Sequence, residues 1–148
     1  MRTLLRIVVV ALGTWGTGYW AMIYFYSILT SGPYFPAASV AQELDVALLT
    51  ALSATVVSSL TWIWPFLKPE KFTNASVVLW TFGGTLAAGV CYALVVWKFD
   101  LCFKPDVFFR ETDFLSFVFE VAPSTAVGAG VSAKLSLLIP AETIQRAT

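Results

Sequence analysis

The chain has 148 residues, of which 58% are hydrophobic and only 12% are charged, and its mean hydropathy is +0.79. An ordinary soluble domain is roughly 25% charged, so this composition indicates an integral membrane protein. Nine basic and nine acidic residues give a net charge of zero, which provides no excess positive charge for binding nucleic acid.

Four apolar runs follow one another, each longer than the about 20 residues that a helix needs to cross a bilayer. They are Leu4–Leu29, Val46–Leu67, Ser76–Phe99 and Phe114–Ile139. The first run is about twice the length of a signal-peptide core, so we expect it to be retained. The short connections leave no room for a soluble domain. We therefore predict a single membrane domain, an all-α up-and-down bundle of four transmembrane helices with both termini on the same side.

The basic residues predict the orientation of this bundle. One side would collect Arg2, Arg6, Lys68, Lys71, Lys134 and Arg146, and the other side Lys98, Lys104 and Arg110. Since Lys and Arg are enriched in cytoplasmic loops, we expect a bacterial inner-membrane protein whose N- and C-termini are cytoplasmic. Tryptophans near the helix ends are expected at the two membrane interfaces, namely Trp62, Trp64, Trp80 and Trp97.

Residues that carry chemistry are scarce. The chain has no histidine, which excludes bis-imidazole haem, the common zinc sites and a histidine general base within this polypeptide. Two Cys and two Met are too few for a soft-metal site, and no Gly-rich phosphate loop follows a strand. We expect no cofactor, no metal and no enzymatic activity. A lipid-modifying enzyme stays open, with Glu120 as base and Lys98 or Arg110 holding an anion.

Small residues recur every four positions in the first three runs. The series are Gly13, Thr17 and Ala21; Ala47, Ala51, Thr55 and Ser59; and Thr81, Thr85, Gly89 and Ala93. Such spacing lets helix backbones approach closely in lipid. The ridges fit packing within one chain, and they also fit association with further copies or with a partner membrane protein.

The fourth run carries the longest ridge, in steps of four: Ser116, Glu120, Ser124, Gly128, Ser132 and Ser136. Each step of four residues rotates the stripe by roughly 40°, so it winds gently round the helix. Pro123 has no N–H for the carbonyl of Phe119, which predicts a kink or break beside Glu120. In an alternative arrangement Phe114–Ala122 is a separate half-helix, and the spanning helix begins near Ser124.

Glu120 is an acid in a strongly apolar stretch, and we expect it to face the bundle with Lys98 as its first partner. It has two interpretations. It is a structural carboxyl that fixes helix register, or it is a titratable site that carries a proton or cation, since burial disfavours the charged form. Lys134, near the cytoplasmic end, is interpreted as an interfacial residue that snorkels toward water.

Together these features predict a non-catalytic, small polytopic membrane subunit surrounded by lipid. It would be homo-oligomeric or part of a larger membrane complex, acting as a sensor, a pore component or an anchor for a partner protein. The alternative is a small ion- or proton-coupled transporter or channel, with Glu120 as its intramembrane titratable site beside the helix break.

Overall fold

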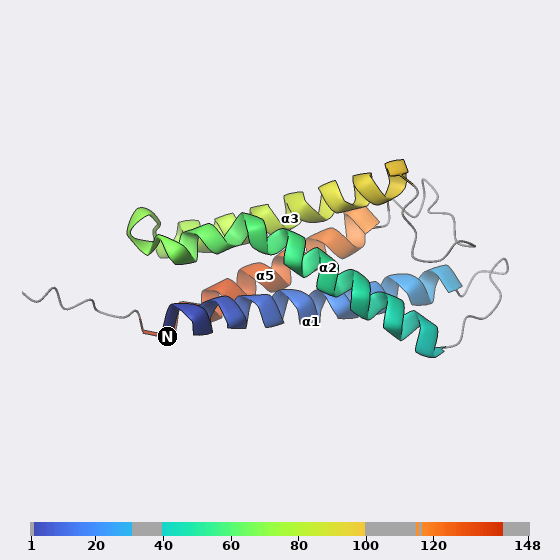
Figure 1. The fold of residues 1–148 in the computed structure, drawn as a ribbon, viewed down its shortest axis with the longest axis horizontal. Helices are drawn as coiled ribbons and strands as arrows, with labels where there is room; N and C mark the ends of the chain where they lie inside the picture. Colours follow the sequence, from blue (N-terminus) through green and yellow to red (C-terminus); the bar gives the residue numbers. More distant parts are fainter. Residues whose placement is uncertain (1, 31–39, 100–114, 116, 141–148) are drawn as a thin grey trace, which may run out of the picture.

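The computed structural model describes residues 2–30, 40–99, 115 and 117–140. These residues form four α-helices and no strand: α1 (Arg2–Thr30), α2 (Val40–Leu67), α3 (Asn74–Phe99) and α5 (Ala122–Ser136). A 3-10 turn, η1 (Pro69–Lys71), lies between α2 and α3, and a π-helical turn, η2 (Phe117–Val121), leads directly into α5. The predicted all-helical class is confirmed for the described residues. Successive helices run in opposite directions (Figure 1).

The four helices pack in a ring. α1 packs against α2 and α5, and α3 packs against the same two helices. The start of α1, the turn η1 and the end of α5 lie at one end of the bundle (Figure 1). Arg6 ties two of them together, because its Nε donates to the carbonyl of Ile139 at 3.1 Å and its Nη2 donates to the same oxygen.

Basic residues gather at this end of the described chain. Lys68 immediately precedes the turn η1, Lys71 ends it, and Lys134 lies in the last turn of α5. Lys98 lies in the last turn of α3, at the opposite end (Figure 1). The remaining basic residues named above, apart from Arg2, lie outside the described residues: Lys104, Arg110 and Arg146.

The helix bounds differ from the predicted ones where polar residues extend a helix. α3 begins at Asn74, before the predicted Ser76, because Thr73 caps it: the Ser76 N–H donates to the Thr73 Oγ1 at 3.2 Å. α2 begins at Val40, before the predicted Val46. The fourth run is not one regular helix, since its described part is a π-helical turn followed by α5. The predicted start of that run, Phe114, lies outside the described residues.

Large apolar side chains fill the two ends of the bundle interior. Near η2 the buried cluster is Met22, Ala93, Phe117 and Val121; near η1 it is Val10, Trp62, Phe66, Val77 and Ala133. Trp62 is fully buried and packs edge-on against Phe66 with ring centroids 6.3 Å apart. Its expected place in an interfacial belt is therefore wrong, whereas Trp64, Trp80 and Trp97 are exposed.

Hydroxyl groups are buried between these clusters without needing partners on other helices. The Oγ1 atoms of Thr14, Thr55 and Thr81 donate to backbone carbonyls four residues earlier, at 2.7, 2.8 and 2.8 Å. This bond satisfies a buried hydroxyl within its own helix. These three hydroxyls therefore add polar atoms to the interior without leaving them unbonded.

Large apolar side chains also cover much of the exterior of the bundle. Leu60, Leu79, Phe119 and Leu138 are each more than two-thirds exposed, at 77%, 69%, 74% and 78%. Within the described residues, two stretches are long and apolar enough to cross a membrane, Arg2–Tyr24 and Asn74–Lys98. The apolar part of α2, Ala51–Leu67, is shorter.

Candidate functional site

In the middle of the bundle, here called the waist, α1 and α5 are in close contact. A Cβ on Gly128 would lie 2.1 Å from the Thr17 Oγ1, and a Cβ on Gly13 would lie 1.8 Å from the Ser132 Oγ. Neither distance can accommodate a real side chain. The small residues found in these two helices therefore serve, at least in part, to bring helices of the same chain into contact.

The buried stripe of α5 differs from the predicted ridge. Its side chains with 2% exposure or less recur at alternating steps of four and three: Ala122, Ala126, Ala129, Ala133 and Ser136. Of the predicted ridge, Gly128, Ser132 and Ser136 are buried, Ser124 and Glu120 are exposed, and Ser116 lies outside the described residues. Because a step of four drifts by roughly 40°, the ridge leaves the buried face within a few turns.

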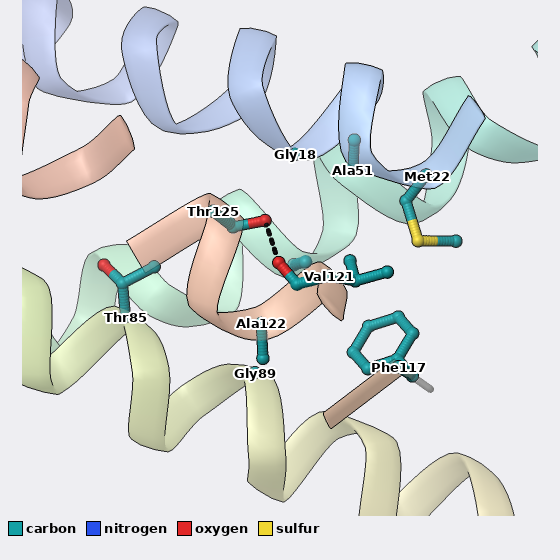
Figure 2. Close-up of a pocket in the computed structure, with 10 residues that line it drawn as sticks. Gly18, Met22, Ala51, Thr85, Gly89, Phe117, Val121, Ala122 and Thr125 are labelled. Carbon is teal, nitrogen blue, oxygen red and sulfur yellow. Dashed lines mark hydrogen bonds between the residues drawn. The ribbon is translucent and has the colours of Figure 1, made fainter. Parts of the chain in front are cut away.

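A small cavity of about 20 Å³ lies at the η2 side of the waist, where all four helices and the π-helical turn meet. Figure 2 shows it below α1, with Met22 and Phe117 on one side and Thr85 on the other. Its lining consists of small and apolar residues with two threonines: Gly18, Met22, Ala51, Ala54, Thr85, Gly89, Phe117, Val121, Ala122 and Thr125.

Two hydroxyls line this cavity and differ in their bonding. The Thr125 Oγ1 donates to the Val121 carbonyl at 2.8 Å, as the dashed line in Figure 2 shows. The Thr85 Oγ1 is buried and has no hydrogen-bond partner, although Thr85 is only 3% exposed. The volume is sufficient for about one water molecule, which needs two to four polar partners to be held firmly.

The chemistry available in the cavity is limited. Its lining contains no titratable side chain and only one soft-metal ligand, the Met22 thioether, and the described residues contain no cluster of three or more His, Cys, Asp or Glu. Acid–base catalysis needs a group whose charge can change, and metal chemistry needs several ligands together. The cavity therefore fits a packing void beneath the π-helical turn and carries no candidate reaction.

Glu120 lies outside the bundle interior. It belongs to η2, whose residues Phe117 and Val121 are buried while Phe119 and Glu120 are exposed. The expectation that Glu120 faces the interior of this chain is wrong. The reason is angular: the positions that η2 turns inward are occupied by Phe117 and Val121, and they pack against Met22 and Ala93.

Lys98, the expected partner of Glu120, lies farther along the bundle. A Cβ on Gly89 would lie 2.9 Å from the Ala122 Cβ, so these two residues are level in the antiparallel pair of α3 and α5. Glu120 is then level with about Cys91, and Lys98 is roughly 10 Å nearer the end of α3 at 1.5 Å per residue. Both charged side chains are exposed, so they do not form the expected buried pair.

Pro123 stands in the first turn of α5, immediately after the π-helical turn. A proline fits the first turn of a helix because the missing N–H has no intrahelical partner there. The change from π- to α-helical geometry thus occurs beside Pro123, in the region where a break was predicted. π-helical turns are rare and are often found at functional positions, which directs attention to the face that carries Glu120.

That face is a continuous exposed stripe, here called the outer stripe of α5. It follows the same alternation of four and three residues as the buried stripe: Glu120, Ser124, Val127, Val131, Lys134 and Leu138. An acid stands at one end, a base near the other and apolar side chains between them. The spacing of this stripe is visible in the sequence. That it faces outward follows only from the structure, in which the alanines on the other face of α5 are buried.

Comparison of the chain with protein-family models, with curated proteins and with solved structures finds no match.

Proposed function

We propose that this protein is a non-catalytic membrane subunit, a four-span helical bundle that assembles with further copies or with a partner membrane protein through the outer stripe of α5. Lipid would surround the rest of the bundle. The proposal joins two properties of the molecule, the large apolar side chains on its exterior and the position of Glu120.

The apolar exterior supports the membrane location. Small residues and threonines fill much of the interior between the two apolar clusters, whereas large apolar side chains, mostly leucine, valine and tryptophan, are exposed on all four helices. Soluble monomers rarely expose contiguous apolar patches larger than a few hundred Å². Residues 117–136 extend for about 30 Å at helical rise, which matches the hydrocarbon thickness of a bilayer.

The exposed position of Glu120 is the main support for the proposed assembly. An ionised carboxylate facing hydrocarbon costs several kcal/mol unless it is paired or protonated. Glu120 is exposed and next to Phe119. Along the bundle axis it lies about two helical turns farther from the bundle end than Lys98. A neighbouring protein surface that donates to the carboxyl would remove this cost, and the apolar part of the stripe would extend the contact.

The interior favours this function over transport through a single chain. The waist is closed by direct contacts of glycine with Thr17 and Ser132, and the cavity beside it holds about 20 Å³. Ion- or proton-coupled transport with Glu120 would accordingly require a path between chains, in an assembly that places the carboxyl at a protein contact.

The experiment is a measurement of native mass after extraction of the tagged protein from its membrane in mild detergent. We expect a defined complex heavier than one chain. Glu120→Gln should shift it toward the monomer, with about thirtyfold weaker association or more, since removing one partner of a buried charged pair costs about 2 kcal/mol or more.

Glu70→Gln is the matched control, because Glu70 is an exposed acid in the turn η1, at the opposite end of the bundle from Glu120. It should leave the complex unchanged. A wild-type protein that is monomeric in the gentlest detergents, without an associated chain, would contradict the proposed assembly.

A further inference from the structure

A groove of about 780 Å³ lies on the outer side of α2 and α3, near the turn η1. Its walls and floor include Leu60, Trp64, Phe72, Leu79, Trp80 and Gly83. The groove has a simple origin in two consecutive glycines of α3. A Cβ on Gly84 would lie 2.7 Å from the Thr61 Oγ1, so Gly84 permits close contact between the helices. A Cβ on Gly83 would meet nothing within 4 Å, so Gly83 leaves open space.

Two of the aromatic side chains that form the groove, Trp80 and Phe72, are held in place. The Trp80 Nε1 donates to the Thr61 carbonyl at 2.7 Å, which fixes the indole across the two helices. The rings of Phe72 and Trp80 pack edge to face with centroids 5.9 Å apart. A groove with fixed aromatic walls loses little side-chain freedom when an apolar chain enters it, so its shape is preorganised for a ligand.

Positive charge lies at one end of the groove. The Lys68 Nζ stands 4.5 Å from the centroid of the Trp64 ring, which itself lines the groove. Lys71 is exposed in the same turn, one residue before Phe72, and Glu70 is the single acid of that turn. The N-terminus of α3, where helix dipoles favour anions, begins immediately beyond.

We propose that this groove binds an anionic phospholipid. One acyl chain lies against Gly83, Trp64 and Trp80, and the phosphate lies beside Lys68 and Lys71. The inference rests on the membrane location proposed above. The lipid and its groove on α2 and α3 are not part of the proposed assembly through α5. The charge at the groove end selects the headgroup, since each Lys or Arg near an anionic surface contributes about fivefold in affinity.

The test is native mass spectrometry of the protein in micelles that contain equal amounts of phosphatidylglycerol and phosphatidylcholine. We expect wild-type protein to retain phosphatidylglycerol preferentially. Lys68→Gln should reduce that preference by about fivefold. Gly83→Leu should reduce retention of phosphatidylglycerol because the leucine occupies the space of the acyl chain.

Gly16→Leu is the matched control for Gly83→Leu. A Cβ at Gly16 likewise meets nothing within 4 Å, and Gly16 lies on α1, away from the groove. This variant should retain lipid as the wild type does. Equal retention of both lipids by the wild type, or a Gly83→Leu variant that binds like Gly16→Leu, would overturn the proposal.

A second measurement separates this inference from the proposed membrane location. Wild-type protein is reconstituted into vesicles of phosphatidylcholine alone and extracted with alkaline carbonate. Protein that remains in these neutral vesicles supports the membrane location whatever the lipid preference is. Protein that is released contradicts the membrane location itself, and with it the basis of the lipid site.

Discussion

Gly128 provides the sharpest test of the waist. In Gly128→Ala the new Cβ would lie 2.1, 2.4 and 2.5 Å from the Oγ1, Cγ2 and Cβ of Thr17. Carbon atoms in contact prefer about 3.5–4.0 Å, so α1 and α5 would have to move apart. Thr17 cannot turn away freely, because its Oγ1 donates to the carbonyls of Gly13 and Thr14 at 2.8 and 3.2 Å.

The expected magnitude follows from comparison with Gly16→Ala. Both glycines lie within helices, where alanine is favoured over glycine by about 1 kcal/mol. Gly16→Ala should show this gain, because its Cβ enters open space. Overpacking at Gly128 costs about 1–3 kcal/mol in addition, so Gly128→Ala should be less stable than Gly16→Ala by that amount.

The assay is unfolding in mild detergent followed by circular dichroism, with both variants and the wild type measured together. Removing the opposing side chain in the double variant Thr17→Gly, Gly128→Ala should restore much of the lost stability, which a double-mutant cycle measures as a coupling. A Gly128→Ala protein as stable as Gly16→Ala would refute the close contact of α1 and α5.

Two further predictions concern polar atoms. Thr85→Val should stabilise the fold by about 1 kcal/mol in the same unfolding assay, because the buried Thr85 hydroxyl has no partner; in Thr81→Val, which loses a 2.8 Å bond to the backbone, no such gain is expected. Arg6→Gln should weaken the attachment of α1 to the end of α5, because it removes charged donors to the Ile139 carbonyl. We expect a loss of about 1 kcal/mol and faster proteolysis after α5; unchanged proteolysis would contradict this attachment.

The number of helices, their order and their alternating direction could be predicted from the sequence, because each depends only on apolar runs and the short segments between them. The ridges of the second and third runs were also informative: Thr55, Thr81 and Thr85 are buried, whereas Gly13, Thr17 and Ala21 of the first ridge are half-buried. For these helices a step of four residues over two or three turns stays close enough to one face to identify it.

The face of the fourth helix could not be predicted in the same way. The inward positions of η2 are Phe117 and Val121, and α5 then continues the buried face from Ala122, so adjacent residues 121 and 122 are both buried. A π-helical turn contains more residues than an α-helical turn, so it shifts the phase of everything before it. The sequence shows the proline that accompanies this shift, but the direction of Glu120 depends on the turn itself.

Burial of an aromatic residue was equally difficult to predict. Trp62 and Trp64 are two positions apart and have similar neighbours in the sequence, yet Trp62 is fully buried and Trp64 is 46% exposed. The difference is their angle around α2, which puts Trp62 against Phe66 and Val77. The groove beside Trp64 depends in addition on Gly83 of another helix, which no pattern within α2 indicates.

Cys91 gives the most direct measurement of the central claim, that the apolar exterior of the bundle faces lipid. It is a free, exposed cysteine within Asn74–Lys98, and in a Cys102→Ser variant it is the only cysteine of the chain. The measurement is its labelling by a water-soluble maleimide in intact membranes, with Glu70→Cys in a chain without other cysteines as the reactive control. The account predicts that Cys91 stays unlabelled until the membrane is dissolved and the protein denatured. Labelling of Cys91 as fast as the control at position 70 would contradict it.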